Sequence, residues 1–288
     1  MPSSPHSPQR SRPATVSPAH QEPGRSGVGP GAGPILVFDS GVGGLSVVES
    51  LRRQLPDAGL AYACDNAMLP YGVRDDSWLV ERILRVCQAA VEASGCAGLV
   101  VACNTASTLA LDALREHLAV PVVGTVPAIK PAAGMSETRH IGLLATSATV
   151  ARPYTLRLIE QFAGDCRVTR IAADPLVAEA ERWVMEGQFD AEVLRNSLAV
   201  LSDTPKLDTM VLGCTHFPLL RQALTDAAPR PLRWVDSGDA IARRAGQVMS
   251  RHAARTGGEV AWVTAPSAAL QHGLRRFGFE QTQTLSLP

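Results

Sequence analysis

The chain alternates short apolar runs with longer amphipathic stretches from residue 34 onward. Short continuous apolar runs predict buried strands, and apolar positions that recur every three or four residues predict helices. The predicted strands are 35–38, 60–64, 98–102, 120–123, 140–145, 168–172, 209–213 and 232–235. The predicted helices are 43–54, 77–94, one from 105, one ending near 162, 175–187, 190–202, one from 218, and 237–252. Strands that alternate with helices predict an α/β fold with mainly parallel sheets and helices on both faces.

The two halves of this pattern repeat each other. Residues 99–105 are LVVACNT and residues 210–216 are MVLGCTH, so each is a buried strand followed by a small residue, a cysteine and two polar residues. Upstream, residues 35–40 align with residues 141–147. We therefore predict two pseudo-symmetric, doubly wound α/β domains. Open parallel sheets bind ligands at the carboxyl ends of their strands, so the active site is expected in the interdomain cleft.

The predicted domains are preceded by a segment of different composition. Residues 1–33 are rich in Pro, Ser, Gly and Arg. Such a segment buries too little apolar surface to offset its chain entropy, which predicts a disordered tail. The first α/β domain is predicted to comprise residues 34–126 plus 236–288, and the second to comprise residues 127–235.

Composition and charge exclude several classes of protein. Hydrophobic residues make up 45% of the chain and charged residues 19%, with a formal net charge of +0. The chain has neither the basic stripe of a nucleic-acid-binding protein nor a run of about 18 apolar residues that would span a membrane. It has no secretory signal and no Cys/His cluster at zinc-binding spacing. We expect a soluble, cytoplasmic protein without a metal, a membrane association or a nucleic-acid partner.

Two of the six cysteines occupy matching positions in the two halves. Cys103 and Cys214 each follow a predicted strand and precede a predicted helix, whose free N–H groups and dipole stabilise a thiolate. Two thiols on opposite sides of a cleft suit the inversion of a stereocentre, because one removes a proton while the other delivers a proton to the opposite face. This arrangement predicts a racemase. The cysteines expected to pack as small apolar residues are Cys64, Cys87, Cys96 and Cys166.

Polar residues beside these cysteines are candidates for assisting the two thiols. The removed proton is only weakly acidic, so the intermediate needs preorganised hydrogen-bond donors. Asn104, Thr105 and Thr215 are the candidate donors. Asp39 and His216 are expected to shuttle protons or to tune the two thiols.

The sequence favours chemistry without a cofactor. Pyridoxal phosphate requires a Schiff-base lysine. The chain has only Lys130 and Lys206, and neither follows a strand in a glycine-rich setting. The glycine-rich segment 41–44 lacks the complete GxGxxG pattern of a dinucleotide-binding loop. It instead favours a tight strand-to-helix turn, whose N–H groups could bind a substrate carboxylate.

Seven stretches of the chain together resemble glutamate racemase, a family of the aspartate/glutamate racemase superfamily. They are VFDSGVGGLSVV (37–48), DNAMLPYG (65–72), VVACNTAS (100–107), VGTVPAIKPA (123–132), GLLATSATV (142–150), VLGCTHFPLL (211–220) and WVDSG (234–238). Their order and spacing agree with the family over residues 35 to about 250. The resemblance implies cofactor-independent interconversion of L- and D-glutamate, supply of D-glutamate for peptidoglycan, and a homodimer.

The resemblance also implies roles for individual residues. Cys103 and Cys214 would form the catalytic pair, with Cys214 acting on L-glutamate and Cys103 on D-glutamate. A family glutamate between the two halves is assigned to Glu181, with Glu179 as the alternative. The residues that would bind substrate or assist the thiols are Asp39, Ser40, Pro70, Tyr71, Gly72, Asn104, Thr105, Thr146, Thr215 and His216.

Three alternative functions are compatible with parts of this pattern. The nearest is a related racemase that acts on aspartate or a hydantoin, although segments 70–72 and 124–132 favour glutamate. A hydrolase with a single nucleophilic cysteine would need one thiol and an oriented histidine, which Cys214 and His216 could imitate. An interaction protein would use residues 1–33 as its binding element.

Overall fold

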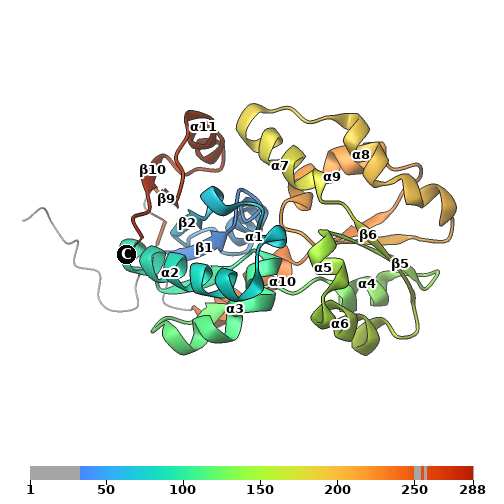
Figure 1. Ribbon diagram of the computed structural model, residues 1–288, viewed down its shortest axis with the longest axis horizontal. Coiled ribbons are helices and arrows are strands. Elements are labelled where there is room, and N and C mark those ends of the chain that lie inside the picture. The colour runs from blue at the N-terminus through green and yellow to red at the C-terminus, as the bar shows by residue number, and fades with distance from the viewer. Residues whose placement is uncertain (1–32, 250–253, 256–257, 288) are drawn as a thin grey trace, which may run out of the picture.

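Two parallel β-sheets form the framework of the molecule (Figure 1). The computed structural model describes residues 33–249, 254–255 and 258–287, so the predicted tail lies, apart from Gly33, outside the described residues. Within that part of the chain the larger sheet has the order β10-β9-β2-β1-β3-β4 and the smaller sheet has the order β6-β5-β7-β8. Every pair of neighbouring strands in these two sheets is parallel.

The strands of the larger sheet come from both ends of the described chain. They are β1 (Ile35–Asp39), β2 (Leu60–Cys64), β3 (Gly98–Val101), β4 (Val122–Val123), β9 (Val260–Val263) and β10 (Gln281–Thr284). The strands of the smaller sheet all come from one uninterrupted stretch of the chain, residues 140–235. They are β5 (His140–Ala145), β6 (Arg167–Ala172), β7 (Thr209–Leu212) and β8 (Arg233–Val235). We propose that the two units divide near residues 126 and 235.

Side chains along each central strand alternate between two hydrophobic cores. On β1, Ile35 and Val37 join one core, and Leu36 and Phe38 join the other. The first core is covered by α1 (Leu45–Gln54), α10 (Gly238–Val248) and α11 (Ala268–Arg276). The second core is covered by α2 (Asp76–Ser94) and α3 (Asn104–His117). Burial on both faces explains why this strand is a continuous apolar run.

The smaller sheet is covered in the same way. On β5, Leu144 belongs to one core while Leu143 and Ala145 belong to the other. The core that contains Leu144 is covered by α7 (Pro175–Glu186), α8 (Ala191–Ser197) and α9 (Arg221–Ala227). The other core is covered by α4 (Ile129–Met135) and α6 (Pro153–Ala163). No helix in the described part of the chain is long and apolar enough to cross a membrane.

Local sequence signals fix the ends of several helices. The side chain of Asp75 accepts hydrogen bonds from the backbone N–H groups of Ser77 and Trp78, both at 3.0 Å, and so caps the start of α2. Gly95 ends α2 and Gly187 ends α7, with φ of 57° and 73° respectively. These left-handed conformations suit glycine because it has no Cβ.

Several elements differ from the sequence-based expectation. The sequence predicts no element beyond residue 252, whereas β9, α11 and β10 lie there. Strand β10 is Gln-Thr-Gln-Thr at the edge of the sheet, so it lacks the apolar signal of a buried strand. Nor does the sequence predict helix α4, because this helix is short and contains Pro131 and Gly134. The helix expected up to residue 162 is divided into α5 (Ser147–Ala151) and α6, because Pro153 begins a new helix.

Two further helices are shorter than expected. Of the helix predicted over 190–202, only α8 is α-helical, and residues Ala199–Asp203 form the 3-10 helix η3. The helix expected from Pro218 starts as the 3-10 helix η4 (Phe217–Leu220) and continues as α9. Two more 3-10 helices, η1 (Asn66–Met68) and η2 (Tyr71–Val73), follow β2.

Candidate active site

A cavity of about 30 Å³ lies where the strand order reverses in both sheets. In the larger sheet this point is between β1 and β3, and in the smaller sheet it is between β5 and β7. Such switch points leave a crevice beyond the carboxyl ends of the strands. The lining residues are Ser40, Leu69, Pro70, Tyr71, Gly72, Cys103, Asn104, Thr105, Thr146, Thr149, Val177, Gly213, Cys214, Thr215 and His216.

The cavity brings together most of the residues singled out from the sequence. Both cysteines line it, as do all predicted substrate-binding residues except Asp39. Asp39 and Glu181 lie behind the lining and reach it through hydrogen bonds. Four lining residues, Leu69, Thr149, Val177 and Gly213, are not predicted from the sequence, although three of the four lie within the family-like stretches. Leu69, Val177 and Gly213 have no polar side chain and so give no chemical signal in a sequence, whereas Thr149 reaches the site through the hydroxyl of Thr146 at 3.0 Å.

Cys103 stands at the junction of β3 and α3. It is the N-cap residue of α3 and is 6% exposed. The hydroxyl of Ser40 lies 3.6 Å from its Sγ. Burial, reinforced by the charge of Asp39, raises the pKa of the Cys103 thiol to about 12. Cys103 is therefore held as a protonated thiol at neutral pH.

Cys214 follows β7 and has a different environment. The Nδ1 atom of His216 lies 3.7 Å from the Cys214 Sγ, and Nε2 lies 2.8 Å from Oε1 of Glu181. Burial lowers the pKa of His216, but the hydrogen bonds to Cys214 and Glu181 outweigh it, so this pKa is well above its usual value. An imidazolium beside a sulfur stabilises negative charge on that sulfur.

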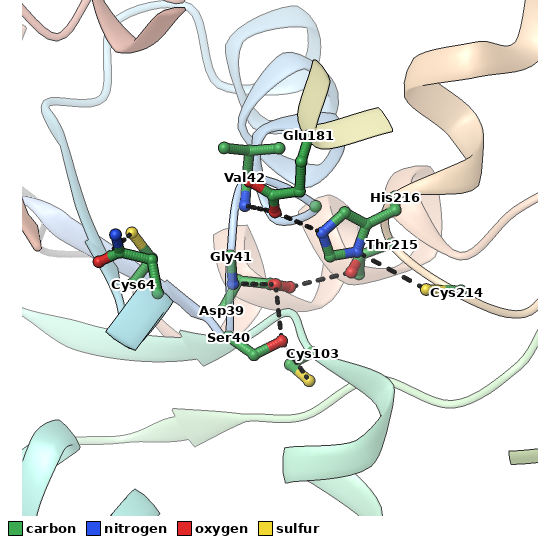
Figure 2. A network of polar contacts seen from close by, with 12 residues as sticks. Asp39, Ser40, Gly41, Val42, Cys64, Cys103, Glu181, Cys214, Thr215 and His216 are labelled. Atoms are coloured by element: carbon green, nitrogen blue, oxygen red, sulfur yellow. Dashed lines mark hydrogen bonds and ion pairs between the residues drawn. The ribbon is translucent and has the colours of Figure 1, made fainter. Parts of the chain in front are cut away.

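Asp39 connects the surroundings of the two cysteines (Figure 2). Its carboxylate is fully buried and accepts hydrogen bonds from the Thr215 hydroxyl at 2.9 Å and the Gly41 N–H at 3.1 Å. Ser40, which contacts Cys103, also donates to it at 3.5 Å. Burial raises the pKa of Asp39, although the charge of His216 and these hydrogen bonds oppose the rise. Figure 2 shows the sulfurs of Cys103 and Cys214 at separate ends of this network.

The glycine-rich segment allows the network to close. A Cβ at Gly41 would lie 2.2 Å from Oε1 of Glu181, and a Cβ at Gly43 would lie 2.4 Å from the Thr215 hydroxyl. The N–H of Val42 donates to Oε1 of Glu181 at 2.8 Å. The segment therefore permits the close approach of two units as well as a tight turn.

The structure also distinguishes the two candidate glutamates. Glu181 joins His216 and Val42 as described. Glu179 instead accepts the Asp190 N–H at 2.7 Å and pairs with Arg182 at 3.2 Å. Glu179 therefore ties α7 to the start of α8 and does not join the network around the cysteines.

A second buried carboxylate, not identified from the sequence, holds Tyr71 against the cavity. Asp65 is fully buried and accepts the Tyr71 hydroxyl at 2.9 Å. Arg82 contacts both oxygens of Asp65, at 2.9 and 2.7 Å, and the Thr264 hydroxyl donates at 2.9 Å. Asp65 lies in the stretch 65–72, but its partners come from α2 and from the loop after β9, which no sequence signal joins to it.

A salt bridge also joins the two units, between the end of α5 and the start of α2. Arg152 makes two hydrogen bonds of 3.0 Å to the carboxylate of Asp76, and its side chain is 16% exposed. Nearby, a Cβ at Gly72 would lie 3.5 Å from Ala148. The cavity itself has room for only about two water molecules.

The site offers few groups to a metal or a cofactor. Among the described residues, no three His, Cys, Asp or Glu side chains are grouped so that they could hold a metal ion. Neither lysine of the chain lines the cavity. Lys130 lies on α4 with its ammonium 5.5 Å from the centre of the Phe162 ring.

The protonated state of Cys103 leads to a test. Alkylation of Cys103 by iodoacetamide, followed by mass spectrometry of its peptide, is expected to accelerate tenfold per pH unit up to pH 10 without levelling, because its pKa is about 12. Replacement Asp39→Asn removes the neighbouring charge and lowers this pKa, so alkylation at fixed pH should be roughly tenfold faster. A plateau near pH 8.5 in the unmodified chain would contradict the assigned state.

Comparison with known proteins agrees with this geometry. The Asp/Glu/Hydantoin racemase family matches residues 35–245. A glutamate racemase of Actinobacillus pleuropneumoniae serotype 3 is 47% identical over 216 residues, which are 75% of this chain and 82% of that protein. A glutamate racemase of Salmonella paratyphi A is 45% identical over 260 residues, which are 88% of this chain and 92% of that protein.

A solved structure gives the same result. The crystal structure of Escherichia coli glutamate racemase, in complex with L-glutamate and the activator UDP-MurNAc-ala, superposes with a TM-score of 0.84 at 41% identity. The match covers 89% of this chain and 99% of the E. coli chain. The two-sheet α/β fold predicted from the sequence is thereby confirmed. The chain belongs to the glutamate racemase family and is an amino-acid racemase, an isomerase.

Proposed function

We propose that the protein interconverts L- and D-glutamate by proton transfer between the α-carbon and two cysteines, Cys103 and Cys214. The observation that carries this proposal is the position of the two thiols. Each follows a central strand of a different sheet, and both line one cavity. A substrate bound between them would present one face of its α-carbon to each sulfur.

The environments of the two thiols indicate which thiol acts as the base and which as the acid in each direction of the reaction. In the conversion of L-glutamate, Cys214 acts as thiolate base, assisted by the His216 imidazolium, and takes the α-proton. Cys103, held as a thiol, delivers its proton to the opposite face. The reaction leaves Cys214 protonated and Cys103 ionised, so both must exchange protons with solvent before the next turnover. D-glutamate reacts with the roles reversed.

Polar groups of the cavity support binding and stabilisation of the intermediate. The side-chain oxygen of Asn104 is buried and has no hydrogen-bond partner among the described residues. A buried acceptor without a partner is costly, and the ammonium group of an amino acid would satisfy it. Thr105 offers a hydroxyl donor for charge that develops on the α-carboxylate, whereas the Thr215 hydroxyl donates to Asp39 and offers the substrate ammonium an acceptor. Pro70, Tyr71, Gly72 and Thr146 occupy another part of the lining and are assigned to the rest of the substrate.

The reaction is proposed to need no pyridoxal phosphate. That cofactor reacts through a lysine, and the only two lysines of the chain lie outside the cavity lining. The proton chemistry is instead assigned to the thiols.

The resemblance and the names of the relatives support a wider role. The protein would be a homodimer in the cytoplasm that supplies D-glutamate for peptidoglycan. All six cysteines are free, which suits a reducing compartment.

The test is conversion of L-glutamate by the purified full chain without added cofactor, followed by chiral chromatography. We expect D-glutamate to accumulate to an equal mixture, with no dependence on pyridoxal phosphate. L-aspartate and a chiral hydantoin serve as competing substrates. Faster racemisation of either would assign the protein to a related activity, and a requirement for pyridoxal phosphate would refute the two-thiol mechanism.

A further inference from the structure

Helix α7 belongs to the hydrophobic cores of both units. Leu176 and Ala180 pack into a core of the smaller sheet. One turn further on, Val184 packs into a core of the larger sheet, and Met185 packs against the same core. Glu181 lies between these two anchoring points and contacts His216 and the backbone of Val42. The position of α7 therefore sets the position of the Glu181 carboxylate.

Helix α11 makes an unusually close contact with the second of these anchoring points. A Cβ at Gly273 would lie 2.8 Å from the backbone oxygen of Val184 and 2.9 Å from its Cγ1. Gly273 is buried, and its backbone conformation is one that alanine adopts freely. Glycine weakens a helix relative to alanine, so helix formation does not explain its presence. The absence of a side chain is what lets the two helices approach this closely.

Arg276, one turn further along α11, binds the end of α7. Its guanidinium donates to the backbone oxygens of Trp183 at 3.4 Å and Val184 at 3.2 Å. It also lies 5.8 Å from the centre of the Trp183 ring. The last carbonyl groups of a helix lack partners within it and carry partial negative charge, so a cation there is stabilising. Gly273 and Arg276 thus hold the same turn of α7.

We propose that Gly273 and Arg276 are positioning residues for racemisation, because they hold α7 where Glu181 can orient His216 beside Cys214. This rests on the two-thiol function proposed above. The Cys214 side of the site is thereby held by the C-terminal part of the chain. Cys103 is instead supported by Ser40 and Asp39, which the contact between α11 and α7 does not touch.

The replacement Gly273→Ala should displace α7. The new Cβ would lie 2.8 Å from the Val184 oxygen, and an ordinary contact between these two atoms is several tenths of an ångström longer. Shifts of this size are costly at an active site. We expect kcat/KM for glutamate to fall roughly tenfold. Arg276→Gln removes the cation and should produce a smaller fall in the same parameter.

Rates alone cannot show which thiol is affected. L- and D-glutamate have equal free energies, so kcat/KM must fall equally in both directions. Primary isotope effects with α-deuterated L- and D-glutamate resolve the two steps. If transfer at Cys214 is slowed, removal of the proton from L-glutamate limits the rate more, and the isotope effect on kcat/KM rises. When the reaction starts from D-glutamate, the intermediate returns to D-glutamate more often before Cys214 protonates it. The isotope effect measured with D-glutamate therefore falls.

Three variants serve as matched controls. Gly134→Ala places a Cβ where nothing lies within 4 Å, on α4. Arg275→Gln makes the same charge change one residue earlier on α11, at an exposed side chain. Arg152→Gln breaks a different contact between the units, the ion pair with Asp76. All three are expected to keep the unmodified ratio of the two isotope effects.

The possible results distinguish failure of this proposal from failure of the two-thiol function. The proposal is supported if the ratio of the L to the D isotope effect rises in Gly273→Ala and in Arg276→Gln but in none of the controls. An unchanged ratio in both variants, or an equal change in Arg152→Gln, overturns it. If thermal unfolding shows that Gly273→Ala does not fold, Arg276→Gln decides, since its side chain is exposed. Absence of any α-proton exchange in the unmodified chain would refute the two-thiol function instead.

Discussion

Replacing Cys103 with alanine is expected to lower racemisation of glutamate roughly a thousandfold while leaving proton exchange on one enantiomer. In the variant Cys214 can still remove the α-proton of L-glutamate from its own face. Without the second thiol, protonation of the opposite face is lost, and Cys214 returns a solvent-derived proton to the same face. In D2O, NMR should therefore show deuterium entering L-glutamate without inversion and no deuterium entering D-glutamate.

The variant Cys214→Ala should give the mirror result, with exchange into D-glutamate alone. Cys166→Ser, at a partly buried cysteine outside the cavity, is the matched control and should keep full activity. A hydrolase with one nucleophilic cysteine would respond to only one of the two cavity variants and would show no α-exchange. Exchange of both enantiomers by either single variant would mean that one base serves both faces, and would contradict the assignment.

The parts of this site that the sequence predicts are those encoded within single strands and the turns after them. Cys103 and Cys214 could be found because each follows an apolar run directly, and parallel strands bring such positions to one edge of a sheet. The internal repeat then paired β1 with β5 and β3 with β7. The structure places these four strands at the two switch points.

The remaining parts depend on contacts between distant segments. Glu179 and Glu181 lie two residues apart on α7, so they point to nearly opposite sides of the helix. Only the packing of α7 against both units shows that Glu181 faces His216. The partners of Asp65 likewise come from α2 and the loop after β9. Hydrophobic periodicity contains no information about either arrangement.

The repeat of the backbone does not extend to the groups that assist the thiols. Cys103 is followed by an asparagine and a threonine, whereas Cys214 is followed by a threonine and a histidine. The first thiol faces Ser40 and the carboxylate of Asp39. The second faces His216, which is linked to Glu181. A symmetric fold thus carries two thiols with opposite electrostatic surroundings, which suits the base and the acid of the proposed catalytic step.

This asymmetry predicts a large effect of His216→Gln. The replacement removes the positive charge beside Cys214 but keeps a polar side chain toward Glu181, and we expect kcat/KM to fall about 100-fold or more. The pH profile should change as well. The pKa of His216 is raised, so the imidazolium persists at neutral pH and is lost only as the pH rises through that value.

In the unmodified protein kcat/KM for L-glutamate should therefore decline on the alkaline side as the imidazolium deprotonates. In His216→Gln that decline should disappear, because the titrating group is absent, and the remaining activity should be low at every pH. The exposed histidine at the end of α3 provides a control, and His117→Gln should keep both the rate and the profile. An alkaline decline that survives in His216→Gln would assign the titration to another group. The charge beside Cys214 would then have to come from the substrate or from the start of the following helix.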